Sequence, residues 1–411
     1  MRATALPELF SISPQLLLQF FNSADARELR LVSRLLLRAA QAHLWDDNTP
    51  AFDLALWRRA YPCARGCRVA PRARVRGPHL ANLRGVTRVS FAGCELASFG
   101  AWDLHPLGAA ARAGQLRLDL SNCPVRFCDR GLQDLRGVRE LSCTGWAVTD
   151  AGLRALAGAR RIRIASPILS DDPHFFDLEA PHVAPIHLTG EGLRALEGAV
   201  CAPGAVCAPG AVHCATREFN LTGPCMLDAG DRSFARLSAL TELKLVYVQG
   251  LDITDAALAA LRNIQTLHIC DCRRAQFTDA GLVALAGVRE LFLEDLPELR
   301  CGDRGVAALA GVERLSLSFA GAVALTDVGL AALAGVHELN LSGARAATFT
   351  DAGLAALAGV GTIHLCGCKN ISVTGAGLVR LAGAQVIDVS GCGIPVSLNN
   401  LVDLRGSQVF I

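Results

Sequence analysis

Residues 326–341 read TDVGLAALAGVHELNL, and this stretch decides the fold because the chain repeats it. From Leu243 onward, the leucine that begins the final Leu-x-Leu of the phrase recurs every 24 residues without a slip. Its equivalents are Leu267, Leu291, Leu315, Leu339, Ile363 and Ile387. Strict self-similarity at a period of about 20 to 50 residues is typical of solenoids, in which each unit buries its apolar face against its neighbours.

Each unit is predicted to contain one short helix and one short strand. Asp327 stands where a helix N-cap is needed, and Gly335 suits the left-handed C-cap. Leu339 and Leu341 then alternate inward around Asn340, which is the period of a strand. The equivalents of the capping aspartate are Asp255, Asp279, Asp303 and Asp351. A carboxylate ladder could also form a metal or catalytic array, but helix capping explains it more simply.

Helices stack at about 8 to 10 Å, whereas parallel strands lie about 4.8 Å apart. The strands should therefore line the inner side of a curved array. The sequence predicts an α/β fold: a horseshoe-shaped solenoid with a parallel concave sheet and short helices on the convex side.

The repeat phrase also carries a family resemblance. Its pattern is Leu267, Ile269, Cys272, Thr278-Asp279 and Gly281-Leu282. This pattern resembles the cysteine-containing leucine-rich repeats of F-box proteins, and it is also similar to the GALA-type repeats of F-box effectors. Either resemblance implies a leucine-rich-repeat solenoid.

The array extends upstream of its regular part, and we expect a repeat domain over residues 79–411 with about thirteen strands. The irregular strands are expected at Val89, Leu118, Leu141, Ile162, Phe219 and Phe410. Two insertions interrupt the register, near residues 166–184 and 199–215. The first is rich in acidic and aromatic residues and is a disordered insertion, a partner contact or a metal site; nothing in the sequence fixes the geometry that a metal would need. The second repeats AVCAPG and is expected to be a mobile loop.

Residues 1–46 lack the 24-residue period and show helical spacing of large apolar residues. Residues 6–8 (LPE) and 25–34 (DARELRLVSR) resemble an F-box, the module that docks substrate receptors onto the adaptor of a cullin-based ubiquitin ligase. The resemblance implies adaptor-binding roles for Leu6, Pro7, Leu9, Leu16, Leu17, Phe20, Leu29 and Val32. The alternative is a helical cap that shields the first repeat. Residues 47–78 form an Arg/Pro-rich connector, with a short helix expected over residues 53–61 and anchored by Trp57.

Composition excludes several function classes. No run of 18 uncharged apolar residues occurs, which argues against a membrane-spanning helix, and the N-terminus does not read as a signal peptide. The net charge of +2 argues against general nucleic-acid or membrane-surface binding. Sixteen cysteines follow the repeat, among them Cys94, Cys123, Cys272, Cys368 and Cys392. We expect buried free thiols and a cytoplasmic or nuclear location.

The chain contains no P-loop, dinucleotide fingerprint, nucleophile elbow or paired zinc motif. We therefore expect no enzyme activity, cofactor or metal, and we place the working surface on the concave sheet. Aromatic and long side chains gather there as Lys244, His268 and Phe292, with Tyr247 and Glu294 close by. A flanking row of glutamates favours a basic partner or is simply solvated; it comprises Glu218, Glu242, Glu290 and Glu338.

These observations, with the resemblance, predict a substrate-recognition subunit of an SCF-type (cullin-RING) ubiquitin ligase. Its F-box would dock the adaptor and cullin, its concave face would hold an unidentified protein substrate, and partner subunits would transfer ubiquitin. The alternative is a ligase-independent binding scaffold with a helical N-terminal cap.

Overall fold

The computed structural model describes residues 54–96, 104–123, 127–166, 186–197 and 216–411. The chain forms two compact units: unit 1 holds residues 1–167 and 198–214, and unit 2 holds residues 168–197 and 215–411. The predicted F-box-like module and nearly all of both predicted insertions lie outside the described residues.

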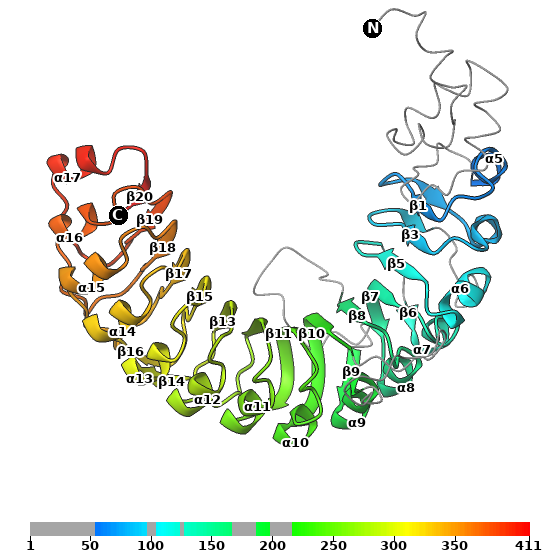
Figure 1. The fold of residues 1–411 in the computed structure, drawn as a ribbon, viewed down its shortest axis with the longest axis horizontal. Helices are drawn as coiled ribbons and strands as arrows, with labels where there is room; N and C mark the ends of the chain where they lie inside the picture. Colours follow the sequence, from blue (N-terminus) through cyan, green and yellow to red (C-terminus); the bar gives the residue numbers. More distant parts are fainter. Residues whose placement is uncertain (1–53, 97–103, 124–126, 167–185, 198–215) are drawn as a thin grey trace, which may run out of the picture. The chain divides into compact units, whose positions relative to one another are not determined.

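Unit 2 is a parallel sheet with a helix after each of most strands (Figure 1). Its sheet strands are β9 (Ile186–Thr189), β10 (Glu218–Gly230), β11 (Glu242–Asp252), β12 (Thr266–Cys270), β13 (Glu290–Glu294), β15 (Arg314–Ser316), β17 (Glu338–Asn340), β18 (Thr362–His364), β19 (Val386–Asp388) and β20 (Gln408–Phe410). A smaller pair, β14 (Arg300–Gly302) and β16 (Ala322–Ala324), lies outside this sheet. The register pairs each strand leucine with the next, as in Leu243 with Leu267 and Leu267 with Leu291.

The helices of unit 2 are one or two turns long and follow one another along the side opposite the sheet (Figure 1). They are α9 (Gly190–Leu193), η4 (Arg194–Leu196), α10 (Asp231–Phe234), α11 (Asp255–Ala260), α12 (Asp279–Ala284), α13 (Asp303–Ala307), α14 (Asp327–Ala332), α15 (Asp351–Ala356), α16 (Gly375–Val379) and α17 (Leu398–Asp403).

Unit 1 repeats this arrangement less regularly. Its parallel sheet runs in the order β1 (Gly66–Arg68), β3 (Arg88–Ser90), β5 (Arg117–Leu120), β7 (Glu140–Ala147) and β8 (Arg161–Ala165). Three short strands pair beside it: β2 (Arg74–Val75), β4 (Glu95–Leu96) and β6 (Phe127–Cys128). Its helices are α5 (Leu54–Ala60), η2 (Gly77–Leu83), η3 (His105–Leu107), α6 (Gly108–Arg112), α7 (Asp129–Gln133) and α8 (Asp150–Ala155).

All thirteen predicted strands are present, and unit 1 adds β1 before them. Sequence analysis misses β1 because its inward residue is Cys67 and the strand contains no leucine or isoleucine. The short helix expected over residues 53–61 is confirmed as α5, with Trp57 buried. β10 and β11 are longer than the predicted short strands, at 13 and 11 residues.

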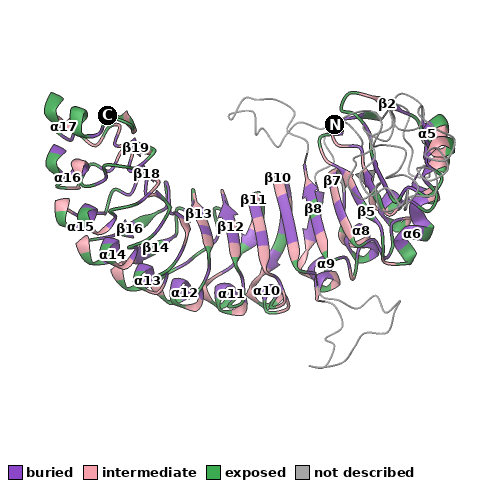
Figure 2. Ribbon diagram, turned by 45° about the horizontal axis from the view of Figure 1, so that its top comes forward, coloured by how far each residue is buried: buried purple, intermediate pink, exposed green. Residues whose placement is uncertain are grey.

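The core lies between the sheet and the helices of each unit (Figure 2). In the repeat of residues 326–341, Leu330 and Leu333 on the helix side and Leu339 and Leu341 on the strand side are at most 1% exposed. Gly335 takes φ +91°, the left-handed conformation predicted for the helix end.

The cysteines follow the predicted pattern. Cys94, Cys123, Cys272 and Cys368 are buried, and Cys392 is half-buried; all are free thiols. Burial raises the pKa of Cys143 and of Cys272 to about 12, so both are neutral at ordinary pH.

The repeated aspartates do not cap their own helices, which corrects the sequence prediction. Thr326 is the N-cap of α14, so Asp327 is the first helical residue. The Asp327 carboxylate accepts bonds from the Thr350 amide at 2.7 Å, the Thr350 hydroxyl at 2.8 Å and the Gly353 amide at 2.9 Å. Asp255, Asp279, Asp303 and Asp351 each likewise accept a hydrogen bond from the amide of the capping residue in the following repeat. Threonine can cap from one position earlier, which leaves the carboxylate for a bridge between repeats.

Four of these five aspartates are followed two positions later by a glycine, and that glycine has a steric reason. A Cβ atom on Gly353 would lie 2.6 Å from Oδ1 of Asp327, closer than such atoms approach. Glycine leaves room for the carboxylate of the preceding repeat at this point. Ala257 stands at the equivalent position after Asp231, whose carboxylate still bonds Thr254. The phrase Asp-x-Gly therefore fixes how one repeat sits on the next.

Candidate functional site

The predicted patch on the strand face of unit 2 is partly brought together. Lys244, His268 and Phe292 are direct neighbours in register on β11, β12 and β13. The His268 and Phe292 rings lie 4.2 Å apart between centroids and are tilted by 38°. The Arg314 guanidinium lies 5.4 Å from the Phe292 centroid, in cation–π range. We call Lys244, His268, Phe292 and Arg314 the central patch.

His268 is a neutral histidine within this patch. Burial lowers its pKa to about 4, with further lowering by the charges of Lys244 and Arg314. Its Nε2 atom is buried and finds no hydrogen-bond partner among the described residues. The imidazole therefore acts as a flat, uncharged surface between two cations.

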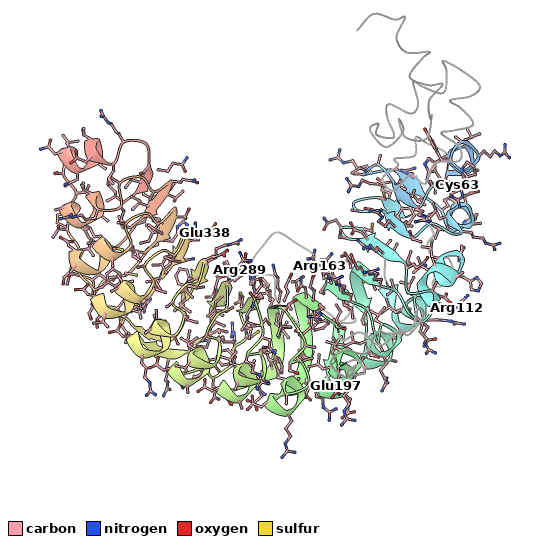
Figure 3. The ribbon with its side chains drawn as sticks, in the orientation of Figure 1. Cys63, Arg112, Arg163, Glu197, Arg289 and Glu338 are labelled. Carbon is pink, nitrogen blue, oxygen red and sulfur yellow. The ribbon has the colours of Figure 1, made fainter. Side chains whose placement is uncertain are left out.

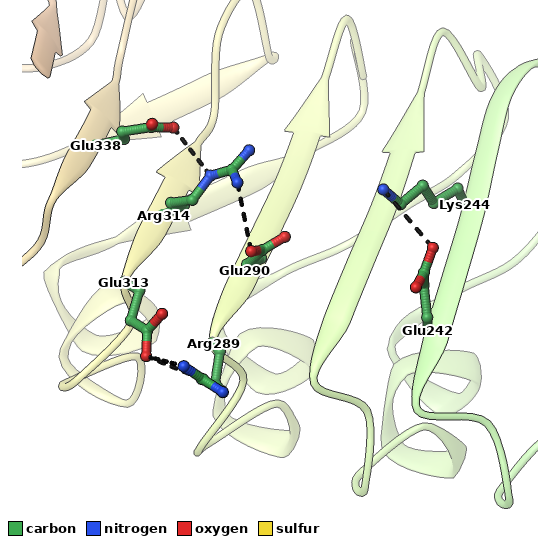
Figure 4. Close-up of polar contacts among 7 residues, drawn as sticks. All are labelled: Glu242, Lys244, Arg289, Glu290, Glu313, Arg314 and Glu338. Carbon is green, nitrogen blue, oxygen red and sulfur yellow. Dashed lines mark hydrogen bonds and ion pairs between the residues drawn. The ribbon is translucent and has the colours of Figure 1, made fainter. Parts of the chain in front are cut away.

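The acidic flanking row is largely occupied by ion pairs (Figure 4). Arg314 contacts Glu290 at 3.4 Å and Glu338 at 2.9 Å, and Lys244 lies 3.7 Å from Glu242. Arg289 and Glu313 pair at 2.6 Å below them. These contacts offset much of the negative charge that the sequence analysis assigned to this row, so the case for a basic partner weakens.

Tyr247 and Glu294, predicted to lie close to the patch, stand further along their strands. Tyr247 lies within β11, directly after the residues that pair with β12. It takes φ +59° and is 39% exposed. Burial raises the pKa of its phenol first, and the charges of Asp271, Asp295 and Glu294 raise it further. Glu294 accepts a hydrogen bond from the Ser316 hydroxyl. Ser316 is the register neighbour of Phe292, so Glu294 adjoins the central patch, whereas Tyr247 lies among the carboxylates of Asp271 and Asp295.

A cavity lies wholly in unit 1, and the sequence analysis did not predict it. Its volume is about 420 Å³, and it opens on the strand face of β1, β3, β5, β7 and β8. Its charged lining consists of Arg68, Arg88, Arg117, Arg161, Arg163, Asp119 and Glu140. We call it the arginine groove. Extending the register of the regular strands upstream would have found it, because these residues occupy the same outward strand positions as the central patch and the glutamate row.

The two carboxylates of the groove have partners within it. Glu140 pairs with Arg117 at 3.4 Å and with Arg161 at 3.2 Å. Asp119 accepts from the Ser121 amide at 3.0 Å and from the Ser90 hydroxyl at 3.3 Å. The arginines keep solvent access: Arg68, Arg88, Arg117 and Arg163 are exposed and Arg161 is half-exposed.

The predicted adaptor-binding residues, Leu6 to Val32, lie outside the described residues. Within the described part of the chain, no helix is long and apolar enough to cross a membrane. No three metal-binding side chains come together in those same segments.

Comparison with known proteins identifies the fold. A leucine-rich-repeat protein from Leptospira interrogans is 14% identical, with a TM-score of 0.53 over 92% of each chain. The leucine-rich-repeat ectodomain of the plant membrane receptor kinase GASSHO1/SCHENGEN3 from Arabidopsis thaliana is 14% identical, with a TM-score of 0.52 over 89% of this chain and 43% of that one. No protein-family model matches the chain, and no curated protein matches it in sequence. The chain thus has the leucine-rich-repeat fold.

Proposed function

We propose that this chain is a non-catalytic binding protein that holds a protein target on the strand face of unit 2, at the central patch. The observation that carries the proposal is the stacked pair His268 and Phe292, set between Lys244 and Arg314. Aromatic and arginine side chains are enriched at protein interfaces, where a few residues carry most of the binding energy. The plant ectodomain of the same fold is in complex with CASPARIAN STRIP INTEGRITY FACTOR 2, which supports a protein or peptide partner.

The experiment compares partners retained by the full chain and by two double variants. Lys244→Ala/Phe292→Ala removes a cation and an aromatic from the patch. Arg304→Ala/Val283→Ala is the matched control, because both side chains are exposed on helices α13 and α12. We expect the patch variant to bind the target at least about tenfold more weakly than the full chain does, and we expect the control variant to bind it as tightly as the full chain. Equal retention by both variants would exclude the central patch as the binding surface.

The finer proposal is that the target is a ubiquitination substrate. The support is the F-box resemblance of residues 1–46, which would dock the adaptor of a cullin-RING ligase in the cytoplasm or nucleus. The fold of unit 2 is compatible with either this role or a ligase-independent scaffold.

Adaptor binding distinguishes the two roles. The full chain and its Leu6→Ala/Pro7→Ala/Val32→Ala variant are expressed at equal levels and probed for the adaptor and cullin. A receptor retains both partners and the variant loses them. A scaffold retains neither, although the central patch still binds its target.

A further inference from the structure

The arginine groove carries a concentrated positive charge that the composition of the chain conceals. Five arginines line it against two carboxylates, whereas the whole chain has a net charge of only +2. Arg88 and Arg117 are direct neighbours in the register of β3 and β5, on the same face. Both side chains are exposed, and a guanidinium carries five N–H donors, so each can bind a further carboxylate.

The arginines form two groups along the groove. Arg68, Arg88 and Arg117 come from the adjacent strands β1, β3 and β5. Arg161 and Arg163 come from β8 and, being two residues apart, face the same side. Figure 3 shows Arg163 on the strand side of unit 1 and Arg112 on its helix side. Between the two groups lies β7, which contributes Glu140 and Ser142.

We propose that the arginine groove binds an extended, acidic segment of a partner protein, with two clusters of aspartate or glutamate. Strands lie about 4.8 Å apart, so three steps from β3 to β8 span about 14 Å. An extended peptide rises about 3.3 Å per residue and needs about four residues for that distance. The matching segment carries an acidic pair, about four uncharged residues, and a second acidic pair. Arginine forks bind carboxylates with two parallel hydrogen bonds, which suits this occupant.

The lining favours a peptide over a nucleic acid. Single-stranded nucleic acids bind on aromatic platforms, and the residues that line the groove include no aromatic side chain. A nucleic acid also presents an unbroken row of phosphates, which Asp119 and Glu140 would repel. An acidic peptide can place its uncharged residues over β7 and Glu140, and Asp119 already accepts from the Ser121 amide and the Ser90 hydroxyl.

The test measures fluorescence polarisation of a labelled peptide with two Asp-Asp pairs separated by four uncharged residues, against the full chain. The same peptide with Asn in place of Asp is the charge control. Two groove variants are Arg88→Gln/Arg117→Gln and Arg68→Gln/Arg163→Gln. The matched protein control is Arg112→Gln, an exposed arginine of the same unit on α6. Circular dichroism and melting temperature establish that each variant is folded.

We expect each groove variant to weaken the Asp peptide at least about tenfold, since each removes two charge-assisted contacts. Arg112→Gln and the unit 2 variant Lys244→Ala/Phe292→Ala should leave the affinity unchanged, which separates this inference from the proposed function. Affinity should fall as salt rises, because the arginines are exposed. Three results would each overturn the proposal: no binding of the Asp peptide, equal binding by folded groove variants, or tighter binding of an oligouridine RNA through the same arginines.

Discussion

The bridge from Asp327 to the next repeat predicts a measurable loss of stability. Asp327→Ala removes the carboxylate that accepts from the Thr350 amide, the Thr350 hydroxyl and the Gly353 amide. A net hydrogen bond contributes about 1 kcal/mol, so the three bonds sum to about 3 kcal/mol. Because Asp327 is half-exposed, water replaces part of the loss, and we expect about 2 kcal/mol.

The loss should be local to the interface between α14 and α15, because repeats in a solenoid contact only their neighbours. Hydrogen exchange, read by mass spectrometry on peptides containing Thr350 and Gly353, should therefore accelerate more than exchange in unit 1. Urea unfolding reports the global effect. Asp327→Asn keeps an oxygen for the two amides and should cost about 1 kcal/mol or less. Asp403→Ala, an exposed aspartate on α17, is the control and should change neither measurement.

The same bonds give the pH dependence a definite sign. Hydrogen bonds from Thr350, chiefly from its amide, and from the Gly353 amide lower the pKa of Asp327 in the folded state. A depressed carboxyl pKa stabilises the fold above the unfolded value of about 4 and loses that contribution as the pH falls through the folded pKa. The difference between wild type and Asp327→Ala should shrink below about pH 4. If Asp327→Ala is no less stable than Asp403→Ala at pH 7, the bridge does not stabilise the array.

Three further outcomes follow from the structure. Gly353→Ala should destabilise unit 2 by about 1 to 3 kcal/mol in urea unfolding through its clash with the preceding repeat, whereas Gly359→Ala, at φ +95° with open space around it, should cost only about 1 to 2 kcal/mol of backbone strain. His268 should stay neutral from pH 8 to 5 in an NMR titration; because its pKa is about 4 when folded, its contribution to stability falls as the pH drops below about 6.5. Under native alkylation followed by mass spectrometry, the exposed thiol of Cys63 should react while Cys143, buried and with a pKa of about 12, stays protected until urea is added.

The repeat architecture can be predicted from the sequence because burial of the same apolar positions produces both the 24-residue period and the packing of the repeats. A leucine every 24 residues must be buried, and Leu243, Leu267 and Leu291 pair in the expected register. The glycine at each helix end is equally readable, since Gly335 must adopt a conformation that other residues avoid. Sequence separation alone placed these residues correctly.

Contacts between repeats are harder to read. The sequence analysis assigned Asp327 to its own helix because the amides of that helix are nearest to it in sequence. The Thr350 amide is 23 residues away, and it becomes a candidate only when the stacking of the repeats is known. The Arg314 contacts were missed for a related reason. The 24-residue period already sets Arg314 between Glu290 and Glu338, but it does not show that the guanidinium reaches both carboxylates.

The two units carry opposite charges at the same outward strand position, which the composition of the whole chain does not reveal. In unit 1 the flanking row presents Arg88, Arg117 and Arg161 around one glutamate, whereas in unit 2 the same row presents glutamates around Arg314. In unit 2 Arg314 pairs with the glutamates on either side of it and offsets part of their negative charge. In unit 1 Glu140 pairs with two arginines, and five arginines line the groove against two carboxylates. A net charge of +2 therefore argues against a uniformly basic surface, but it leaves room for one groove that attracts acidic chains.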